Sequence, residues 1–187
     1  MSNVYRPELV VFKQLLDGDQ KKAIGESNLD PSAGGGAKDL RFPYVPFAPA
    51  MNRLFPSISA ETTKNGGEIR SGLVRWSDVH GHSQSMSVEY WSPTEARPTE
   101  GRISTISKIP PLASIPSSGL HNDPLFLLLI LETNQEFIVR CPTRSELIQG
   151  WHPDVWKPVV ASLELARGRA AAMGWIDLKN GTEYLHS

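Results

Sequence analysis

An uninterrupted apolar run from Leu125 to Leu131 is the feature that most constrains this 187-residue chain. The run is too short to cross a membrane, which takes about 20 apolar residues, but it has the length of a strand. Turn-forming residues bound it, with Asn122-Asp123-Pro124 before it and Glu132-Thr133-Asn134 after it. Because a strand that is apolar at every position must be covered on both faces, the run predicts a central, buried strand.

Several neighbouring segments also have the composition of strands. Ser85–Trp91 alternates apolar and polar residues, which is typical of a half-buried strand. Glu68–Trp76 is rich in β-compatible residues and follows the turn signal Asn65-Gly66-Gly67. Gly101–Ser107 is a weaker candidate, and Glu136–Cys141 should form a hairpin with the central strand. Strands that neighbour one another in sequence predict an antiparallel barrel in a mainly β domain with a few helices.

Three segments predict helices. Ala48–Phe55 could form a short helix, with Pro49 tolerated in its first turn. Thr143–Gln149 begins with an N-cap threonine and has Glu146 three residues later, which predicts a helix with a capping box. Pro158–Met173 has apolar residues at helical spacing and is rich in alanine, so it predicts a longer helix.

Length, charge and cysteine content limit the class of protein. A single domain is expected over residues 1–187, with a long flexible loop at Asp17–Arg41 around Gly34-Gly35-Gly36. The net charge of −1 argues against a protein that coats nucleic acid nonspecifically, but basic residues gathered on one face could still read a specific site. The single Cys141 fits a reducing cytoplasm. No apolar run predicts a membrane helix, so no membrane partner is expected.

Short motifs occur along the chain in a fixed order. The block Leu54-Phe55-Pro56-Ser57-Ile58 follows the glycine-rich loop and precedes the predicted strands. The segment Glu100-Gly101-Arg102-Ile103-Ser104 follows the second of those strands. Over roughly residues 9 to 150, this order resembles the N-terminal effector domain of EcoRII-like type IIE restriction endonucleases. That domain has a Gly-Gly loop, the same Leu-Phe-Pro-Ser-Ile block and a Glu-x-Arg-Ile-Thr segment.

The resemblance implies a B3-like DNA-binding pseudobarrel whose two arms enter the major groove of double-stranded DNA at a CC(A/T)GG-like site. The chain would then be the non-catalytic recognition domain of a bacterial restriction endonuclease, with the catalytic domain following residue 187. No cofactor is expected for this domain, whereas Mg²⁺ is expected for the parent nuclease. A monomer is expected, because no long exposed edge strand or apolar helix face stands out.

The resemblance also implies a set of DNA-contacting residues. Arginine can bind both acceptors of guanine, and a carboxylate can accept from the amino group of cytosine. Glu100 and Arg102 match the family motif directly, whereas Arg97 matches only with one inserted residue. Gly101 stands where the family has a basic residue, so a contact there would be missing or made by the backbone. The expected DNA-binding residues are Lys38, Asp39 and Arg41 on the N-terminal arm and Glu95, Arg97, Thr99, Glu100 and Arg102 on the C-terminal arm, with phosphate contacts from Lys64, Arg70, Arg75 and Lys108.

A metal-dependent nuclease is the alternative function. Pro153-Asp154 and Asp177-Leu178-Lys179 match the loose PD…(D/E)xK pattern, in which two carboxylates hold Mg²⁺ and a lysine helps to activate water. The pattern is short and arises often by chance. We expect Asp177 to follow a long helix near the chain end, with too little chain left to build the required sheet.

Other features have simpler interpretations. Glu100 and Arg102 could be an exposed cross-strand pair, and a protein-binding β module is a third function class if no nucleic acid binds. His80-Gly81-His82 lies in a polar turn without a cysteine close by, so it predicts a loop rather than a metal site. The tryptophans Trp76, Trp91 and Trp151 are expected to be core or rim aromatics.

Overall fold

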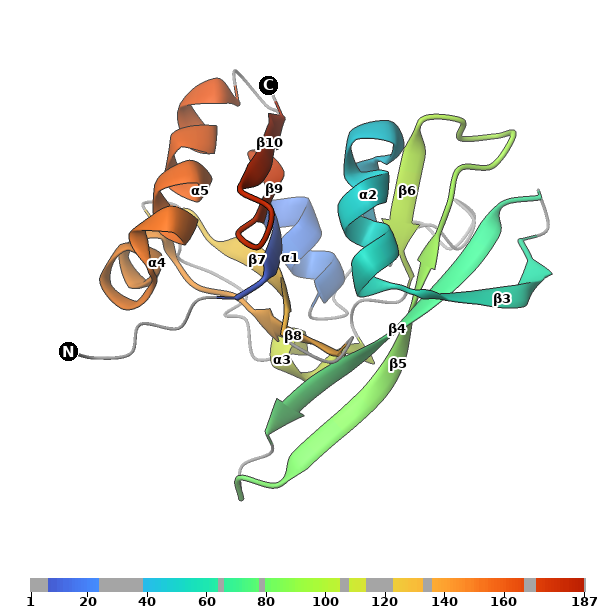
Figure 1. The fold of residues 1–187 in the computed structure, drawn as a ribbon, viewed down its shortest axis with the longest axis horizontal. Coiled ribbons are helices and arrows are strands. Elements are labelled where there is room, and N and C mark those ends of the chain that lie inside the picture. Colours follow the sequence, from blue (N-terminus) through green and yellow to red (C-terminus); the bar gives the residue numbers. More distant parts are fainter. Residues whose placement is uncertain are drawn as a thin grey trace.

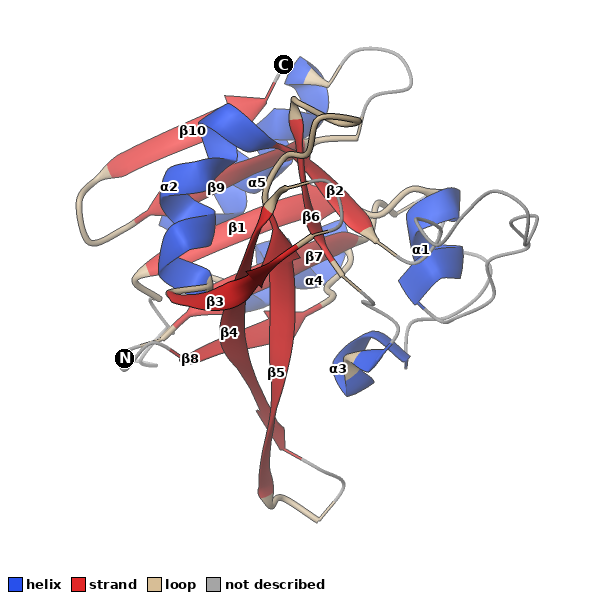
Figure 2. Ribbon diagram, turned by 90° about the vertical axis from the view of Figure 1, so that its right-hand side faces the viewer, coloured by secondary structure: helices blue, strands red, loops and turns tan. Residues whose placement is uncertain are grey.

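The computed structural model describes residues 7–23, 39–63, 66–77, 80–104, 108–113, 123–132, 136–166 and 171–186. These residues form a curled sheet with helices packed against it (Figures 1 and 2), which confirms a mainly β fold with a few helices. The strands are β1 (Leu9–Gln14), β2 (Leu40–Pro43), β3 (Ser57–Thr62), β4 (Glu68–Ser77), β5 (Ser83–Trp91), β6 (Glu100–Ile103), β7 (Phe126–Leu131), β8 (Glu136–Arg140), β9 (Met173–Asp177) and β10 (Thr182–His186). The helices are α1 (Asp17–Ala23), α2 (Tyr44–Leu54), α3 (Pro110–Ala113), α4 (Arg144–Gly150) and α5 (Pro153–Leu165).

Strand β7 lies inside the sheet, whose order is β10-β9-β1-β7-β8-β4-β5-β6-β2. It is buried along its whole length, as the apolar run predicted, and it forms the expected hairpin with β8. Its alternate residues enter two cores: Leu127 packs on the side of α2, and Leu128 packs on the side of α4 and α5. A continuous apolar sequence is therefore needed here, because helices cover both faces of the sheet (Figure 2).

Strands β4 and β5 form a long twisted hairpin that projects from the rest of the molecule (Figures 1 and 2). The predicted alternation in β5 is confirmed, because Val88 and Tyr90 are buried whereas Ser87 and Glu89 are exposed. On its other edge, β4 pairs first with β3 and then, in parallel, with β8, so the sheet forks at Gly72. The parallel pair departs from the purely antiparallel barrel expected from the sequence.

Prolines in helices account for two wrong boundaries. Helix α2 begins at Tyr44 instead of Ala48, so Pro49 lies inside the helix and not in its first turn. Pro46 lies in the first turn, where backbone N–H groups have no intrahelical acceptor and a proline costs little. Helix α5 begins at Pro153, a favourable first position, and Pro158 lies in its interior.

The segment that follows α5 was also predicted wrongly. The expected helix Pro158–Met173 ends at Leu165, and Met173 begins strand β9. Strand β9 pairs with β1 on one side and with β10 on the other, so Asp177 does lie in a sheet. These pairings join segments far apart in sequence, which local periodicity does not reveal.

The expected loop at Asp17–Arg41 is wrong at both ends. Its first residues form α1, and Leu40 and Arg41 belong to β2. The glycine triplet and Lys38 lie outside the described residues. The predicted capping box of α4 is confirmed, since Thr143 Oγ1 accepts from the backbone N–H of Glu146 and the Glu146 carboxylate accepts from that of Thr143. Among the described helices, none combines the length and apolar character needed to cross a membrane.

Candidate nucleic-acid interface

Strand pairing brings the two predicted arms together at one edge of the sheet. Strand β2 pairs antiparallel with β6, so that Arg41 lies opposite Arg102 and Pro43 lies opposite Glu100. Strand β6 pairs in turn with β5, where Trp91 lies opposite Arg102. Along both β2 and β6 buried and partly exposed residues alternate, so Arg41, Glu100 and Arg102 share the outward face.

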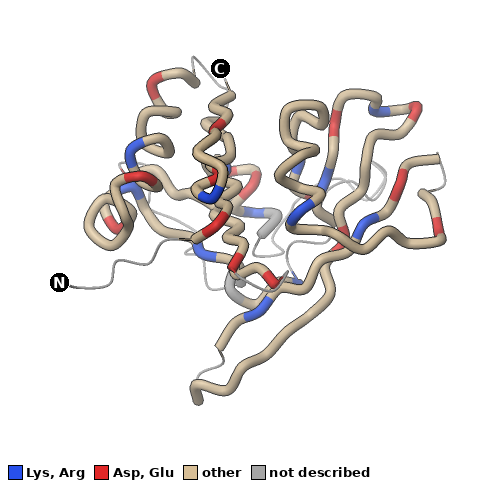
Figure 3. The backbone as a smooth tube through the Cα atoms, in the orientation of Figure 1, with Lys and Arg blue, Asp and Glu red and all other residues tan. Residues whose placement is uncertain are grey.

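The outward side chains of this face form ion pairs with one another, with Arg97 and with the buried Asp39. Glu100 Oε2 lies 3.6 Å from Arg41 Nη1 and 3.8 Å from Arg97 Nη1. Asp39 Oδ2 lies 3.4 Å from Arg102 Nη1. We call Asp39, Arg41, Arg97, Glu100 and Arg102 the arginine–carboxylate cluster. Acidic and basic positions are interspersed in this part of the molecule (Figure 3), so the cluster is not a uniformly basic patch.

The structure describes most of the predicted DNA-binding residues. The five members of the cluster come together, and Glu95 and Thr99 are exposed in the turns that precede β6. A tight turn closed by backbone hydrogen bonds between Thr94 and Arg97 holds Glu95 at its tip. Lys38 lies outside the described residues.

Two guanidinium groups of the cluster retain unused hydrogen-bonding capacity. Within the described part of the chain, neither Arg41 Nε nor Arg97 Nη1 has a hydrogen-bond acceptor, although both atoms are enclosed. The two side chains remain 39% and 36% exposed. Both side chains therefore have one enclosed N–H group without an acceptor among the described residues, while the rest of each guanidinium-bearing side chain stays accessible to a ligand.

Arg102 is held more firmly than the other two arginines. Its side chain is 18% exposed, and its guanidinium lies 4.6 Å from the centre of the Trp91 ring. The Trp91 indole N–H donates to the Glu89 carboxylate at 2.9 Å. Only a core or rim role was predicted for Trp91, because its contact with Arg102 depends on the register between β5 and β6.

Gly101 faces the interior and not the outward face. A Cβ at Gly101 would lie 1.9 Å from the hydroxyl oxygen of Tyr90. Tyr90 is fully buried, stacks on Phe55 with ring centres 5.4 Å apart, and has no hydrogen-bond partner for its hydroxyl among the described residues. Burial, reinforced by the neighbouring Tyr44, raises the pKa of Tyr90 above its usual value. A basic side chain at position 101 would therefore point into the core.

The residues expected to contact phosphates are dispersed. Arg70 pairs with Glu68 at 2.6 Å, and Arg75 pairs with Glu132 and, at 3.4 Å, with Glu136. Lys108 is exposed, and Lys64 lies outside the described residues. Arg70 and Arg75 are thus each engaged by neighbouring carboxylates.

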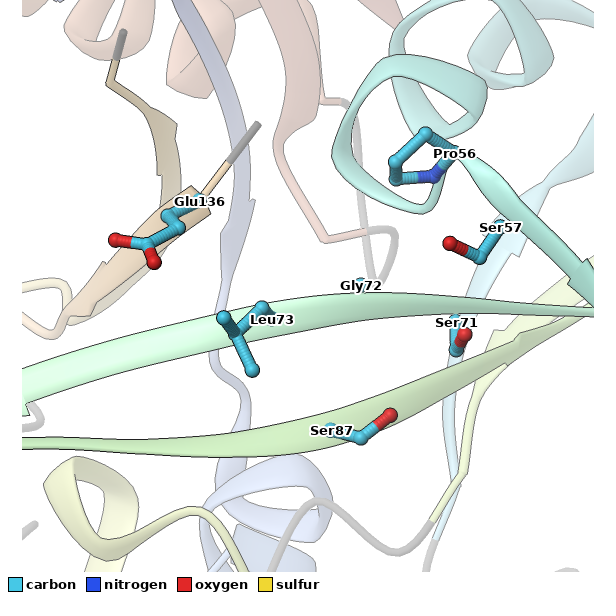
Figure 4. Close-up of a pocket in the computed structure, with 7 residues that line it drawn as sticks. All are labelled: Pro56, Ser57, Ser71, Gly72, Leu73, Ser87 and Glu136. Carbon is cyan, nitrogen blue, oxygen red and sulfur yellow. The ribbon is translucent and has the colours of Figure 1, made fainter. Parts of the chain in front are cut away.

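A pocket of about 340 Å³ opens at the fork of the sheet (Figure 4). Its lining includes the hydroxyl groups of Ser57, Ser71 and Ser87. Ser87 lies on the same face of β5 as Trp91, since the two residues are an even number of positions apart. Glu136 is the charged residue of the lining, so the pocket offers hydroxyl groups rather than a cation.

The residues of the alternative nuclease motif have other partners. Asp154 and Asp177 line one shallow pocket of about 480 Å³, but Lys179 extends toward Glu8, with Nζ and Oε1 3.5 Å apart. The Asp177 carboxylate lies 2.6 Å from Arg53 Nη1 and accepts hydrogen bonds from the side chain and backbone of Asn180.

The contacts of Asp177 with Arg53 and Asn180 are those of a residue that stabilises the fold. Burial by itself would raise its pKa, but the hydrogen bonds from Asn180 and the charge of Arg53 outweigh that effect and hold the pKa below its usual value. Within the described ranges, no group of three or more His, Cys, Asp or Glu side chains is arranged to hold a metal ion. His80 and His82 are exposed at the turn of the β4–β5 hairpin, with ring centres 6.1 Å apart.

Comparisons with known proteins add no relative. No family model matches the chain, and no curated protein matches it either. The arginine–carboxylate cluster is thus characterised by its own geometry and by the motifs that it contains.

Proposed function

We propose that this chain is a sequence-specific double-stranded DNA-binding domain, similar to the effector domains of EcoRII-like restriction endonucleases and with their B3-like pseudobarrel fold. The observation that supports the proposal is the meeting of Asp39 and Arg41 with Arg97, Glu100 and Arg102 in one cluster of ion pairs at the edge of the sheet. Two segments far apart in sequence, each expected from the motifs to contact DNA, become neighbours there.

The chemistry of the cluster suits G·C base pairs. A guanine edge offers two acceptors to an arginine, and the paired cytosine offers a donor to a carboxylate. A G·C pair can therefore satisfy both partners of an Arg–Glu or Arg–Asp contact at once. A phosphate group satisfies only the arginine and leaves the carboxylate repelled. This difference supports specific reading by a chain whose net charge is −1.

The proposed domain binds DNA and does not cut it. In the family that it resembles, cleavage belongs to a separate catalytic domain, and Mg²⁺ serves that domain. We propose CC(A/T)GG-like DNA as the target, read by one copy of the chain, with the cluster at the base of two arms.

A fluorescence anisotropy titration tests the proposal. One duplex carries CC(A/T)GG, the other a scrambled site of the same composition, and Mg²⁺ is omitted at near-physiological salt. We expect a preference of about 10³-fold or more for the CC(A/T)GG duplex, because specific affinity exceeds nonspecific affinity by at least that factor in typical readers. Equal affinity for the two duplexes, or no binding, would overturn the proposal.

A double variant assigns the binding to the cluster. Changing Glu100→Ala together with Arg102→Ala should weaken specific binding by about 1–3 kcal/mol for each lost base contact. The matched control is Arg144→Ala with Glu164→Ala, which removes the same charges from exposed positions on α4 and α5. The control should bind the specific duplex like the wild type.

Plasmid incubated with Mg²⁺ separates binding from the alternative nuclease function. We expect no cleavage by the chain. Cleavage that is abolished by Asp154→Ala would replace the proposed function by the nuclease. Asp154 is the suitable position for this test, because it is exposed at the start of α5 whereas Asp177 supports the fold.

A further inference from the structure

A series of contacts at the arginine–carboxylate cluster joins three segments of the chain. The Glu89 carboxylate holds the indole N–H of Trp91, the Trp91 ring covers the guanidinium of Arg102, and Asp39 pairs with that guanidinium. Glu89 and Trp91 lie on β5, Arg102 lies on β6, and Asp39 directly precedes β2. Arg102 is therefore fixed both on a ring face and by an ion pair.

This arrangement lowers the cost of ordering Arg102 when a ligand binds. A free arginine side chain has about 2 kcal/mol of rotamer entropy to lose, and immobilising it opposes binding. A ring stacked on the guanidinium restricts the orientation of its plane. Because stacking uses the face of that plane, N–H groups in the plane remain directed toward acceptors such as those of guanine.

Arg102 differs in this respect from the other arginines of the cluster. Arg41 and Arg97 share Glu100 and are about twice as exposed as Arg102. Among the described residues, Arg102 is the member of the cluster with a recorded ring contact. The register that sets Trp91 opposite Arg102 makes this contact a property of the sheet.

We propose that Trp91 is a positioning residue for base recognition: its indole, locked by Glu89, holds the Arg102 guanidinium in the orientation that reads one base pair. The inference rests on the proposed DNA-binding function and adds a residue outside the expected site. Trp91 touches no base in this proposal and acts through Arg102. Its loss should therefore reduce discrimination at one base pair more than it reduces general affinity for DNA.

Three variants test the role of Trp91. Trp91→Leu removes the ring, Trp91→Phe keeps a smaller ring, and Glu89→Gln leaves the indole in place but weakens its anchor. The controls are Trp151→Phe, at a partly buried tryptophan of the other core, and Glu61→Gln, at an exposed acid on β3. Circular dichroism and thermal unfolding establish that each variant is folded. If Trp91→Leu does not fold, Glu89→Gln still tests the role of Trp91.

The first readout uses the protein without DNA. The ¹⁵N and ¹H resonances of the Arg102 Nε–H group report how tightly the guanidinium is held. We expect Trp91→Leu and Glu89→Gln to shift this signal and to speed its exchange with water, whereas both controls leave it unchanged. An Arg102 signal that is the same in all folded variants would overturn the proposal independently of any DNA measurement.

The second readout is affinity for the CC(A/T)GG duplex, for duplexes with one G·C pair exchanged, and for the scrambled duplex. Trp91→Leu should weaken specific binding about 2- to 30-fold, the range of a cation–π contact, and Trp91→Phe should recover part of the loss. Scrambled-duplex affinity should change by less than twofold. Equal losses on all duplexes, or no loss at all, would overturn the positioning role. If the wild type binds the CC(A/T)GG and scrambled duplexes equally, the proposed DNA-binding function is overturned. The positioning role of Trp91 is then overturned with it, whatever the Arg102 signal shows.

Discussion

Arg41 on β2 and Arg102 on β6 lie directly opposite each other in the sheet, although like charges at paired positions repel. Each arginine has its own carboxylate, Glu100 for Arg41 and Asp39 for Arg102. These carboxylates offset the repulsion and also compete with any phosphate that approaches. The carboxylates that stabilise Arg41 and Arg102 at the sheet edge thus also disfavour nonspecific binding of phosphates.

Removing the charge of Glu100 should change specific and nonspecific binding in opposite directions. In Glu100→Gln, Arg41 and Arg97 lose a competing carboxylate, so affinity for the scrambled duplex should rise and depend more steeply on salt. Affinity for the CC(A/T)GG duplex should fall, because the neutral amide oxygen of Gln is a weaker acceptor for the cytosine amino group than a carboxylate. Anisotropy titrations at several salt concentrations measure both effects. Parallel changes on the two duplexes would contradict the prediction, and Glu61→Gln controls for net charge.

Gly101→Ala should destabilise the domain, because the added Cβ would meet the Tyr90 hydroxyl oxygen. The expected loss is about 1–3 kcal/mol in the free energy of unfolding, the usual cost of overpacking a core. Urea unfolding followed by tryptophan fluorescence measures it. An unchanged midpoint would show that β6 shifts freely away from Tyr90.

Tyr90→Phe is the companion variant, and it should be neutral or stabilising. It removes a buried hydroxyl that has no partner among the described residues, so no hydrogen bond is lost and a desolvation penalty is relieved. In the double variant the penalty of Gly101→Ala should shrink but persist, since the ring carbon that bears the hydroxyl would lie only 2.6 Å from the new Cβ. Additive effects would mean that the two positions are not coupled.

The parts of the fold that local sequence determines were predicted well. The run of β7, the alternation in β5 and the capping box of α4 each depend on neighbouring residues, and each is confirmed. Strands β1, β9 and β10 were missed, because they are defined by pairing with each other and with β7 across most of the chain. Pro49 and Pro158 were taken to mark helix starts, whereas both lie inside helices that begin earlier, at Tyr44 and Pro153.

The candidate site was likewise predicted only where local motifs encode it, and not where strand pairing sets the contacts. The motifs suggested Glu100 and Arg102, and strand pairing sets both on one outward face with Arg41. The contacts of Trp91 with Arg102 and of Tyr90 with Gly101 were not predicted, because they follow from a register that no local pattern encodes. Alternation along β6 was the available signal for Gly101, since a residue between two outward side chains must face inward.

Acid should weaken the fold partly through Asp177. Its pKa is lowered in the folded chain, so its ionised form stabilises the fold above the unfolded pKa of about 3.9, and that contribution is lost as pH falls through the folded value. Asp177→Asn should cost about 1–3 kcal/mol at pH 7 through its charged hydrogen bonds, and should flatten the dependence of stability on pH below about 4. Thermal unfolding from pH 7 to pH 3 tests both effects. Asp154→Asn, at an exposed carboxylate, should retain the pH dependence of the wild type.

Cys141 should react slowly with thiol reagents in the folded protein. Burial raises its pKa to about 12, and the charge of Arg140 offsets only part of this effect. Because the thiolate is the reactive form, modification by iodoacetamide at pH 8 should be at least about 100-fold slower than in urea. Mass spectrometry follows the reaction at the single cysteine of the chain. Equal rates with and without urea would contradict a buried thiol.

The alternation along β6 has a practical consequence for engineering. Gly101 and Ile103 hold the strand to the core, whereas Glu100 and Arg102 leave the core untouched. Residues that set the chemistry of the surface can therefore be exchanged without repacking the interior. A library randomised at 41, 100 and 102 would vary preference for ligands while the scaffold stays constant, which makes this edge of the sheet a natural place to select new specificities.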